Sequence, residues 1–260
     1  MAPLETTLPD TLRVSIESGV AAVLLYRPDK RNSLDEALIG GMTSLFGELS
    51  HRNDVRVVTI EGAGGHFCSG LYLNYLEKIS SYGVTENLAD SSRFRDMMLA
   101  IYRCPKPVIA KVRGYALAGG CGIASACDLI VADTTAQFGY TEVRFGFIPA
   151  IVAPFLIRRV GEAVARDLLL TARIISADEA RELNFANRVV SPEKLDATVT
   201  VVCEQLLKNS ASSLALTKEL FANIDNTTLE NAVDFARHVN AYTRMTDDFK
   251  KGLKGFLEKK

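Results

Sequence analysis

The chain has 260 residues, of which 48% are hydrophobic and 23% are charged, and its net charge is −1. This composition is typical of a globular protein that buries one sizeable core. The balanced charge excludes a general electrostatic attraction to nucleic acid or to an anionic membrane surface, so neither is expected as a partner. No run of residues approaches the roughly 20 apolar residues of a membrane span.

The five cysteines form no C-x-x-C pair, which favours reduced thiols in a reducing compartment. The first ten residues, MAPLETTLPD, lack the basic end and the apolar segment of a secretion signal. These two features together predict a cytoplasmic location.

Two short apolar runs near the N-terminus, Leu12–Glu17 and Val20–Leu25, are separated by a Ser-Gly pair and predict a β-hairpin. A capping box from Ser33 to Glu36 then predicts a helix that ends at about Leu49. Further along, buried strands are predicted at Val55–Glu61, Pro107–Val112 and Leu129–Ala132, with a helix of small residues at Gly119–Ala126. Strands that alternate with helices predict an α/β fold with largely parallel pairing.

The last third of the chain has a different pattern. A second capping box runs from Ser176 to Glu179, and from Glu193 onward three or four consecutive helices are predicted. We therefore divide the chain into a core, residues 1–192, and a helical C-terminal region, residues 193–260.

Two loops of small residues each leave a predicted strand and enter a helix. The first is His66–Leu71 and the second is Gly114–Gly122. Such junctions present free backbone N–H groups at the positive end of a helix dipole, and two that converge would stabilise a carbonyl oxygen as it gains negative charge. The alternative is that the glycines merely allow tight turns and close packing.

Glu142 lies soon after a strand in an apolar, aromatic-rich segment, Phe138–Pro149. Apolar surroundings raise the pKa of a carboxyl group and suit it to exchange protons near neutral pH. The alternative is a surface glutamate paired with Arg144 or another cation.

Four other kinds of site fit the sequence poorly. The glycines after Val55–Glu61 resemble a dinucleotide fingerprint, but Phe67 stands where the last glycine is needed. The segment around Ser69 lacks the G-x-S-x-G pattern of a serine hydrolase. The chain has only three histidines and no metal-ligand spacing among them, so no metal is expected. Cys68 has no identifiable partner base and is interpreted as a packing residue.

Taken together, several segments resemble the crotonase (enoyl-CoA hydratase/isomerase) superfamily over nearly the whole chain. The segments are RPDKRNSLD (27–35), VRVVTIEGAGGHFCSGLYL (55–73), CPKPVIAKVRGYALAGGCGIASACDLIVA (104–132), AQFGYTEVRFGFIPA (136–150), ARIISADEARELNFANRVV (172–190) and a basic end with Phe256 and Lys259. The resemblance implies a spiral of ββα turns followed by C-terminal helices that form a homotrimer, often as a dimer of trimers.

The resemblance also implies an acyl-CoA thioester as substrate, with no cofactor beyond the coenzyme A that the substrate carries. Glu142 would be the catalytic carboxylate, and the backbone N–H groups of Ser69 and Gly119 would form the oxyanion hole. The expected contacts with substrate and coenzyme A are Lys30, Arg31, Phe67, Gly70, Leu71, Tyr72, Gly120, Phe256 and Lys259, the last two from a neighbouring subunit.

Two positions depart from the superfamily pattern. Hydratases of this superfamily carry two cooperating glutamates; Glu142 matches the second, but the first falls on Gly122. The usual aspartate after the first oxyanion loop is replaced by Tyr72. One carboxylate could hydrate a double bond by a syn addition, with help from a hydroxyl of Tyr140, Tyr115 or Ser125. An isomerase that moves a double bond between C3 and C2 needs only one base, whereas a thioesterase and a non-catalytic CoA-binding scaffold are weaker alternatives.

The glycine at 122, the E-V-R-x-G-x-I-P-A run that begins at Glu142 and the stretch Leu73–Leu76 resemble bacterial methylglutaconyl-CoA hydratase-like proteins. This likeness favours hydratase over isomerase, with 3-methylglutaconyl-CoA as a candidate substrate. Its second carboxylate would need a cation, for which Arg144 and Arg95 are the candidates.

Overall fold

The computed structural model describes residues 4–224 and 227–258, so Lys259 lies outside the described residues. Its main sheet has six strands in the order β1-β2-β3-β4-β6-β9. Their bounds are Leu12–Glu17 (β1), Val20–Leu25 (β2), Val57–Gly62 (β3), Val108–Val112 (β4), Leu129–Asp133 (β6) and Arg188–Val190 (β9).

The predicted hairpin is confirmed, because β1 and β2 pair antiparallel with Leu12 opposite Leu25. All other neighbours in this sheet are parallel, as the alternation of strands and helices predicts.

Apolar side chains cover both faces of the sheet. One face and the helices upon it form the main core, with Val58, Ile60 and Ala110 from the strands in the same buried cluster as Leu45 and Met98. The helices before the C-terminal region are Glu36–His51 (α1), Leu73–Ser80 (α2), Val84–Arg103 (α3), Gly119–Ala126 (α4), Ala153–Thr171 (α5) and Ala177–Glu182 (α6).

The opposite face is covered by α7, Leu195–Leu207, whose Val199 and Val202 pack against Val57 and Ile109. The central strands β3, β4 and β6 are buried on both faces and therefore appear as nearly continuous apolar runs in the sequence.

The first predicted capping box is wrong in its details. Helix α1 begins at Glu36, and its N-cap is Asp35, whose Oδ1 accepts a hydrogen bond from the Leu38 N–H at 2.9 Å. Ser33 cannot serve as the cap because Leu34 is held in an extended bridge with Leu71. The second box begins as expected, since the Ser176 hydroxyl accepts from the Glu179 N–H, but the Glu179 carboxylate pairs with Arg173.

A smaller sheet stands beside the main one, with the order β5-β7-β8. Its strands are Tyr115–Leu117 (β5), Gln137–Gly139 (β7) and Ile174–Ser176 (β8). Strand β5 leads directly into α4, and β7 leads into a 3-10 turn at Glu142–Phe145, so this sheet brings together the two segments that the sequence marks for chemistry.

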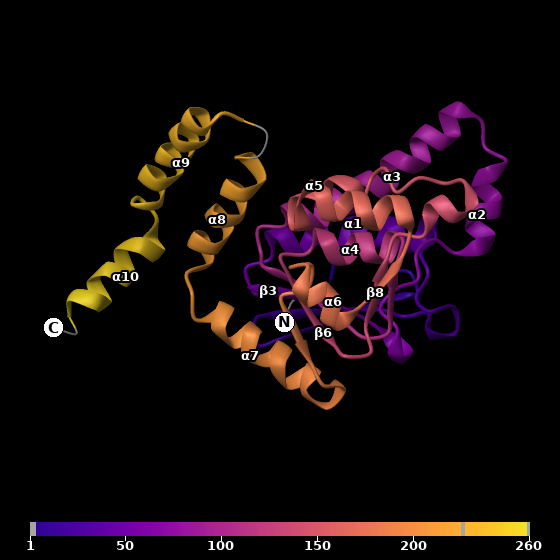
Figure 1. The fold of residues 1–260 in the computed structure, drawn as a ribbon. Coiled ribbons are helices and arrows are strands. Elements are labelled where there is room, and N and C mark those ends of the chain that lie inside the picture. Colours follow the sequence, from indigo (N-terminus) through magenta and orange to yellow (C-terminus); the bar gives the residue numbers. More distant parts are fainter. Residues whose placement is uncertain (1–3, 225–226, 259–260) are drawn as a thin grey trace.

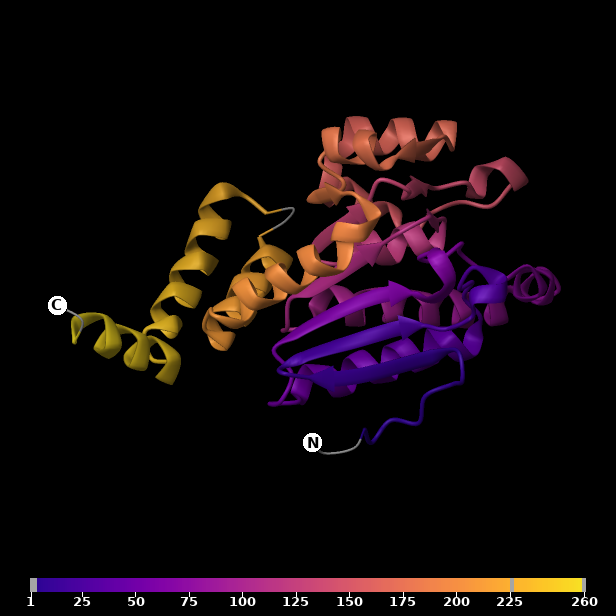
Figure 2. The ribbon, with the colours of Figure 1, turned by 90° about the horizontal axis from the view of Figure 1, so that it is seen from below.

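Three helices follow α7: Ala211–Asn223 (α8), Leu229–Thr243 (α9) and Asp247–Leu257 (α10). Both ribbon views show α9 and α10 standing clear of the sheet-containing body (Figure 1, Figure 2). The prediction of three or four C-terminal helices is confirmed, although α7 belongs to the core by its packing. Within the described residues, no helix combines the length and apolar character needed to cross a membrane.

Candidate active site

A cavity of about 450 Å³ opens between the central loops and helices α2 and α3. Its wall is mainly apolar and contains both predicted catalytic segments. The lining residues are Ile39, Ser69, Leu71, Leu73, Leu76, Ile79, Asp90, Ser91, Phe94, Ala118, Gly119, Thr141, Glu142, Phe145 and residues 147–152.

Glu142 is the buried carboxyl group of this cavity. Its side chain is only 5% exposed, and within residues 4–224 and 227–258 its Oε2 has no hydrogen-bond partner. Burial raises the pKa of Glu142 from 4.5 to about 6, because the charged form loses water and the hydrogen bond from its own backbone N–H offsets this loss only in part. A carboxyl group in this state is able both to take and to return a proton near neutral pH. The alternative of a surface ion pair with Arg144 is excluded by this burial.

The two glycine-containing loops lie side by side, joined by backbone hydrogen bonds. The Cys68 N–H donates to the Tyr115 carbonyl at 3.0 Å, and the Leu117 N–H donates to the Cys68 carbonyl at 2.9 Å. One hydrogen bond also ties the second loop to the segment before Glu142, from the Ala118 N–H to the Gly139 carbonyl at 2.8 Å. Segments distant in sequence therefore meet at one end of the cavity.

Ser69, expected to supply the first oxyanion donor, is engaged elsewhere. Its N–H donates to the Arg31 carbonyl at 3.0 Å. The amide two residues later is different: Gly70 C=O and Tyr72 N–H both bond to Leu34, so the intervening Leu71 N–H points to the opposite side of this extended segment. No acceptor for the Leu71 N–H is found among the residues that the structure describes, and Leu71 lines the cavity.

Gly119 is the first residue of α4, so its N–H has no partner within the helix and lies at the positive end of the helix dipole. A methyl group built on Gly70 would come within 3.4 Å of the Gly119 nitrogen, which shows how closely the two loops approach. The segment before Leu71 and the Gly119 amide therefore approach closely, and the Ser69 N–H, which donates to Arg31, is not free to act as the expected oxyanion donor.

This approach has a conformational cost that the sequence did not reveal. Ala118, immediately before Gly119, has φ 49° and ψ −124°, a region that residues other than glycine rarely adopt. Gly120 has no room for a side chain, since an added Cβ would lie 2.2 Å from the Cys68 carbonyl oxygen. Strain of this kind, held by surrounding structure, commonly occurs where a backbone group is positioned for function.

The position of the absent glutamate is filled by an apolar side chain. A Cβ on Gly122 would lie 2.2 Å from Val152 Cγ1, and Val152 itself is buried and lines the cavity. A carboxylate could not be accommodated at residue 122 without moving Val152.

None of the three hydroxyl groups considered as helpers lines the cavity. The Ser125 hydroxyl donates to the Gly122 carbonyl at 2.8 Å, and the Tyr140 hydroxyl donates to the Cys121 carbonyl at 3.5 Å. The Tyr115 ring stacks on His66 at 4.8 Å between centroids. Glu142 therefore has no hydroxyl partner among these residues.

The proposed cations for a second carboxylate are also placed elsewhere. Arg144 donates to the Ala172 carbonyl at 2.5 Å, and Arg95 pairs with Asp96 at 2.7 Å. Neither arginine lines the cavity.

The residues expected to contact substrate and coenzyme A fall into three groups. Leu71 lines the cavity that contains Glu142, whereas Lys30 and Tyr72 line a second, more polar hollow. Arg31 lies over the Tyr115 ring at 5.2 Å from its centroid. Phe67 is completely buried in the core, and Gly70 and Gly120 allow the close contact between the loops. Phe256, on α10, is 66% exposed.

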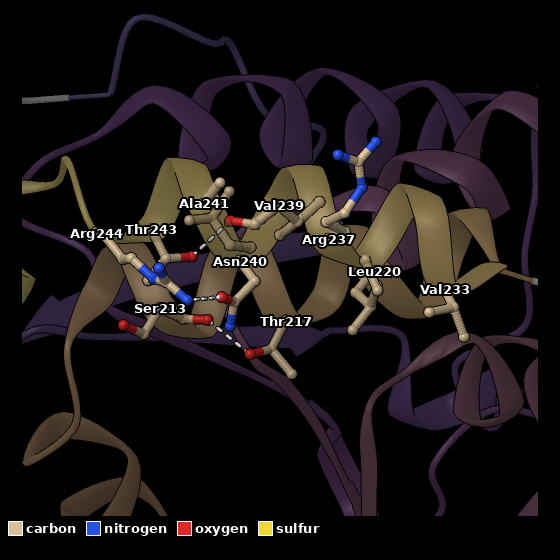
Figure 3. Close-up of a pocket in the computed structure, with 12 residues that line it drawn as sticks. Ser213, Thr217, Leu220, Val233, Arg237, Val239, Asn240, Ala241, Thr243 and Arg244 are labelled. Atoms are coloured by element: carbon tan, nitrogen blue, oxygen red, sulfur yellow. Dashed lines mark hydrogen bonds between the residues drawn. The ribbon is translucent and has the colours of Figure 1, made fainter. Parts of the chain in front are cut away.

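A second cavity, of about 590 Å³, lies between α8 and α9 (Figure 3). Leu216, Leu220 and Val233 line it together with Arg237 and Arg244, and its Thr217 hydroxyl is bonded to the Ser213 carbonyl. No carboxylate, thiol, histidine or lysine is among its lining residues in the described parts of the chain, so no general base stands beside its hydroxyl groups. Likewise, those parts contain no cluster of histidine, cysteine and acidic residues that could hold a metal.

Comparison with known proteins identifies the class to which this fold and site belong. The family model described as enoyl-CoA hydratase/isomerase matches residues 15–260. A Thermus thermophilus protein that carries an enoyl-CoA hydratase name is 40% identical over 248 residues, which are 95% of this chain and 98% of the relative. An (E)-benzylidenesuccinyl-CoA hydratase of Thauera aromatica is 34% identical over 257 residues, 97% of both chains.

Among solved structures, an enoyl-CoA hydratase from Mycobacterium smegmatis is similar with a TM-score of 0.90 at 32% identity, covering 97% of this chain and 98% of that one. The chain belongs to the enoyl-CoA hydratase/isomerase family and has the crotonase fold.

Proposed function

We propose that this protein is an enoyl-CoA hydratase that adds water across the 2,3-double bond of an acyl-CoA thioester. The observation that carries the proposal is the buried Glu142, whose Oε2 has no partner among the described residues, in the same cavity as the free Leu71 and Gly119 amides. The names of full-length relatives support it. The reaction needs no cofactor beyond the coenzyme A of the substrate.

In this mechanism, the Leu71 and Gly119 N–H groups hold the thioester oxygen and stabilise the enolate, at the end of the helix dipole of α4. Glu142 removes a proton from water as the oxygen bonds to C3, and the same carboxyl group delivers that proton to C2. Water adds overall, and Glu142 returns to its charged form.

Migration of a double bond is the second candidate, and one observation favours it. Val152 occupies the space beside Gly122, so no second carboxylate is placed there to orient a water molecule. An isomerase needs only one base, which removes a proton at C4 and returns it at C2 across the same enolate. The apolar wall beside Glu142 suits this reaction.

The decisive experiment follows crotonyl-CoA and 3-pentenoyl-CoA in heavy water by mass spectrometry. Gain of one water with deuterium at C2 identifies a hydratase, whereas movement of the double bond without added water identifies an isomerase. Glu142→Gln should lower either rate by about 10²- to 10⁴-fold while thioester binding remains. Release of free CoA would instead indicate a thioesterase, and full activity of Glu142→Gln would refute the assigned role.

The sequence motifs shared with methylglutaconyl-CoA hydratase-like proteins make 3-methylglutaconyl-CoA one candidate for the specific substrate. This acyl group ends in a second carboxylate, for which no cation lines the described part of the cavity. The structure therefore gives this substrate no support beyond the sequence motifs.

We also propose that the C-terminal helices form a homotrimer, alone or as a dimer of trimers. None of the described residues of α8, α9 and α10 is buried, yet these helices carry large apolar side chains. The exposed set includes Phe221, Leu229, Val233, Tyr242, Phe249, Leu253, Phe256 and Leu257. Apolar faces of this size need a partner, and a second copy of the chain provides one. The predicted coenzyme A contacts of Phe256 and Lys259 depend on this assembly.

A further inference from the structure

We infer that the acyl cavity takes an uncharged acyl chain and that Asp90 is the residue that makes it reject a chain ending in a second carboxylate. This inference rests on the proposed function, because it concerns the acyl group of the same CoA thioester.

The ionisable side chains of the cavity wall all have the same sign of charge. Two ionisable side chains line it, Glu142 and Asp90, and both are acidic. No lysine, arginine or histidine is among the described residues that line it. Most of the remaining wall is aliphatic or aromatic: Ile39, Leu71, Leu76, Ile79, Phe94, Phe145, Phe147, Ile148, Ile151 and Val152.

Asp90 is fixed in position by two donors. The hydroxyl of the buried Tyr75 donates to Asp90 Oδ1, and Arg93 Nη2 lies 3.1 Å from the same oxygen. Within the described residues, no group is hydrogen-bonded to Asp90 Oδ2. The carboxylate is thus held at the wall with one oxygen still unpaired.

The two nearest cations do not line the cavity. Arg93 is shared between Asp90 and Glu36, whose Oε1 lies 3.4 Å from Arg93 Nη2. Lys78 pairs with the other oxygen of Glu36 at 2.9 Å. Arg93 Nη2 and Lys78 Nζ are therefore both engaged by acidic side chains outside the lining of the cavity.

The position of a second carboxylate follows from how the substrate is held. With the thioester oxygen at Leu71 and Gly119, and C3 beside Glu142, the last carbon of a five-carbon chain lies two bonds beyond C3, among apolar side chains. A carboxylate there loses its hydration without a cation to replace it, and it shares the cavity with the negative charge of Asp90. An alkyl chain of the same length has no charge, so it loses no ionic hydration and is not repelled by Asp90.

The test compares two saturated thioesters that cannot react by hydration, pentanoyl-CoA and glutaryl-CoA. They share the coenzyme A and the five-carbon chain and differ only in a terminal methyl or carboxylate. Affinities are measured by titration calorimetry at low and high salt. We expect pentanoyl-CoA to bind the wild-type protein at least about tenfold more tightly, because the terminal carboxylate of glutaryl-CoA loses its hydration in a cavity whose ionisable side chains are both acidic.

Asp90→Asn should bring the ratio of the two affinities closer to one, since it removes the negative charge and keeps the shape of the side chain. Asp96→Asn is the matched control: it removes the same charge from the same helix at an exposed ion pair with Arg95, and it should leave the ratio unchanged. Glutaryl-CoA binding as tightly as pentanoyl-CoA, or a ratio that Asp90→Asn does not move, would overturn the inference while leaving the proposed reaction intact. Failure of both thioesters to bind would overturn the proposed function itself, and the inference with it.

Discussion

Glu142 combines three properties that rarely occur together on a structural glutamate: burial, an unpaired oxygen and a raised pKa. Each follows from the apolar segment in which it lies, and each is needed for a group that takes and returns a proton in one cycle. Val152 completes this environment, since it fills the space that a second carboxylate would need and keeps the wall beside Glu142 apolar.

The pH dependence of activity should report the pKa of Glu142. The base acts in its charged form, so kcat/KM should rise with pH through an apparent pKa of about 6 and level off above it. The measurement is a pH profile with a substrate that does not titrate in this range. A profile that is flat between pH 5 and 8 would contradict the proposed base.

The free energy of unfolding should fall as pH rises, whereas activity should increase. The pKa of Glu142 is raised from 4.5 to about 6 in the folded protein, so the folded state binds more protons between these values and loses stability as pH rises. The difference corresponds to about 2 kcal/mol, at about 1.4 kcal/mol per pKa unit. Urea unfolding of Glu142→Gln should accordingly show a gain over the wild type at pH 8 and none below pH 4.5.

At the scale of elements, the site depends on two loops that approach within van der Waals contact. Strand β5 pairs with the Cys68 segment and continues into α4, while the strained backbone of Ala118 directs the first amide of α4 toward the cavity. The separation of the Leu71 and Gly119 amides is therefore set by the smallest side chains of these loops.

Gly120→Ala should separate the loops and misplace the two amides. The new Cβ would meet the Cys68 carbonyl, a backbone group that cannot rotate away, and loss of one oxyanion donor typically lowers kcat by about 10²- to 10³-fold. Gly47→Ala is the matched control, because Gly47 lies on the exposed face of α1 with no atom within 4 Å of an added Cβ. The control should keep its activity and gain about 0.5–1 kcal/mol of stability. Equal activity of both variants would show that the contact does not set the donor geometry.

At the scale of the whole molecule, the chain divides into a body with two well-packed cores and three helices that bury nothing by themselves. Helix α8 is tied to the body through Lys218, which donates to the Lys106 carbonyl at 2.9 Å. Helices α9 and α10 extend beyond it (Figure 2). The cavity between α8 and α9 is lined by both apolar and polar side chains of these two helices (Figure 3).

Assembly should therefore depend on α10. We expect the protein to sediment at three times the 28.4 kDa chain mass, or at six times. The double variant Phe249→Glu and Leu253→Glu should shift it toward the monomer, since charge on an apolar interface is not tolerated. Lys251→Glu, on the other side of the same helix, is the control and should leave the mass unchanged. A monomeric wild-type protein in analytical ultracentrifugation would refute the proposed assembly.

The sequence by itself determined the fold class, the positions of strands β1, β2, β3, β4 and β6 along the chain, and Glu142 as the candidate base. These features depend on local patterns, namely the apolar periodicity of each segment and the position of a carboxyl group among aromatic residues. The helix start at Asp35 was missed because the extended bridge of Leu34 with Leu71 is a long-range contact that overrides the local capping pattern.

Only the tertiary structure decided which groups act together. Ser69 and Leu71 are indistinguishable as amides in the sequence, and it is the pairing with Arg31 and Leu34 that occupies one N–H and turns the other toward the cavity. In the same way, Val152 lies thirty residues from Gly122 in the chain, yet its side chain occupies the space that a side chain at residue 122 would need. Asp90 lines the cavity because helix α3 passes beside it. Such relations depend on packing between distant segments, which residue patterns do not encode.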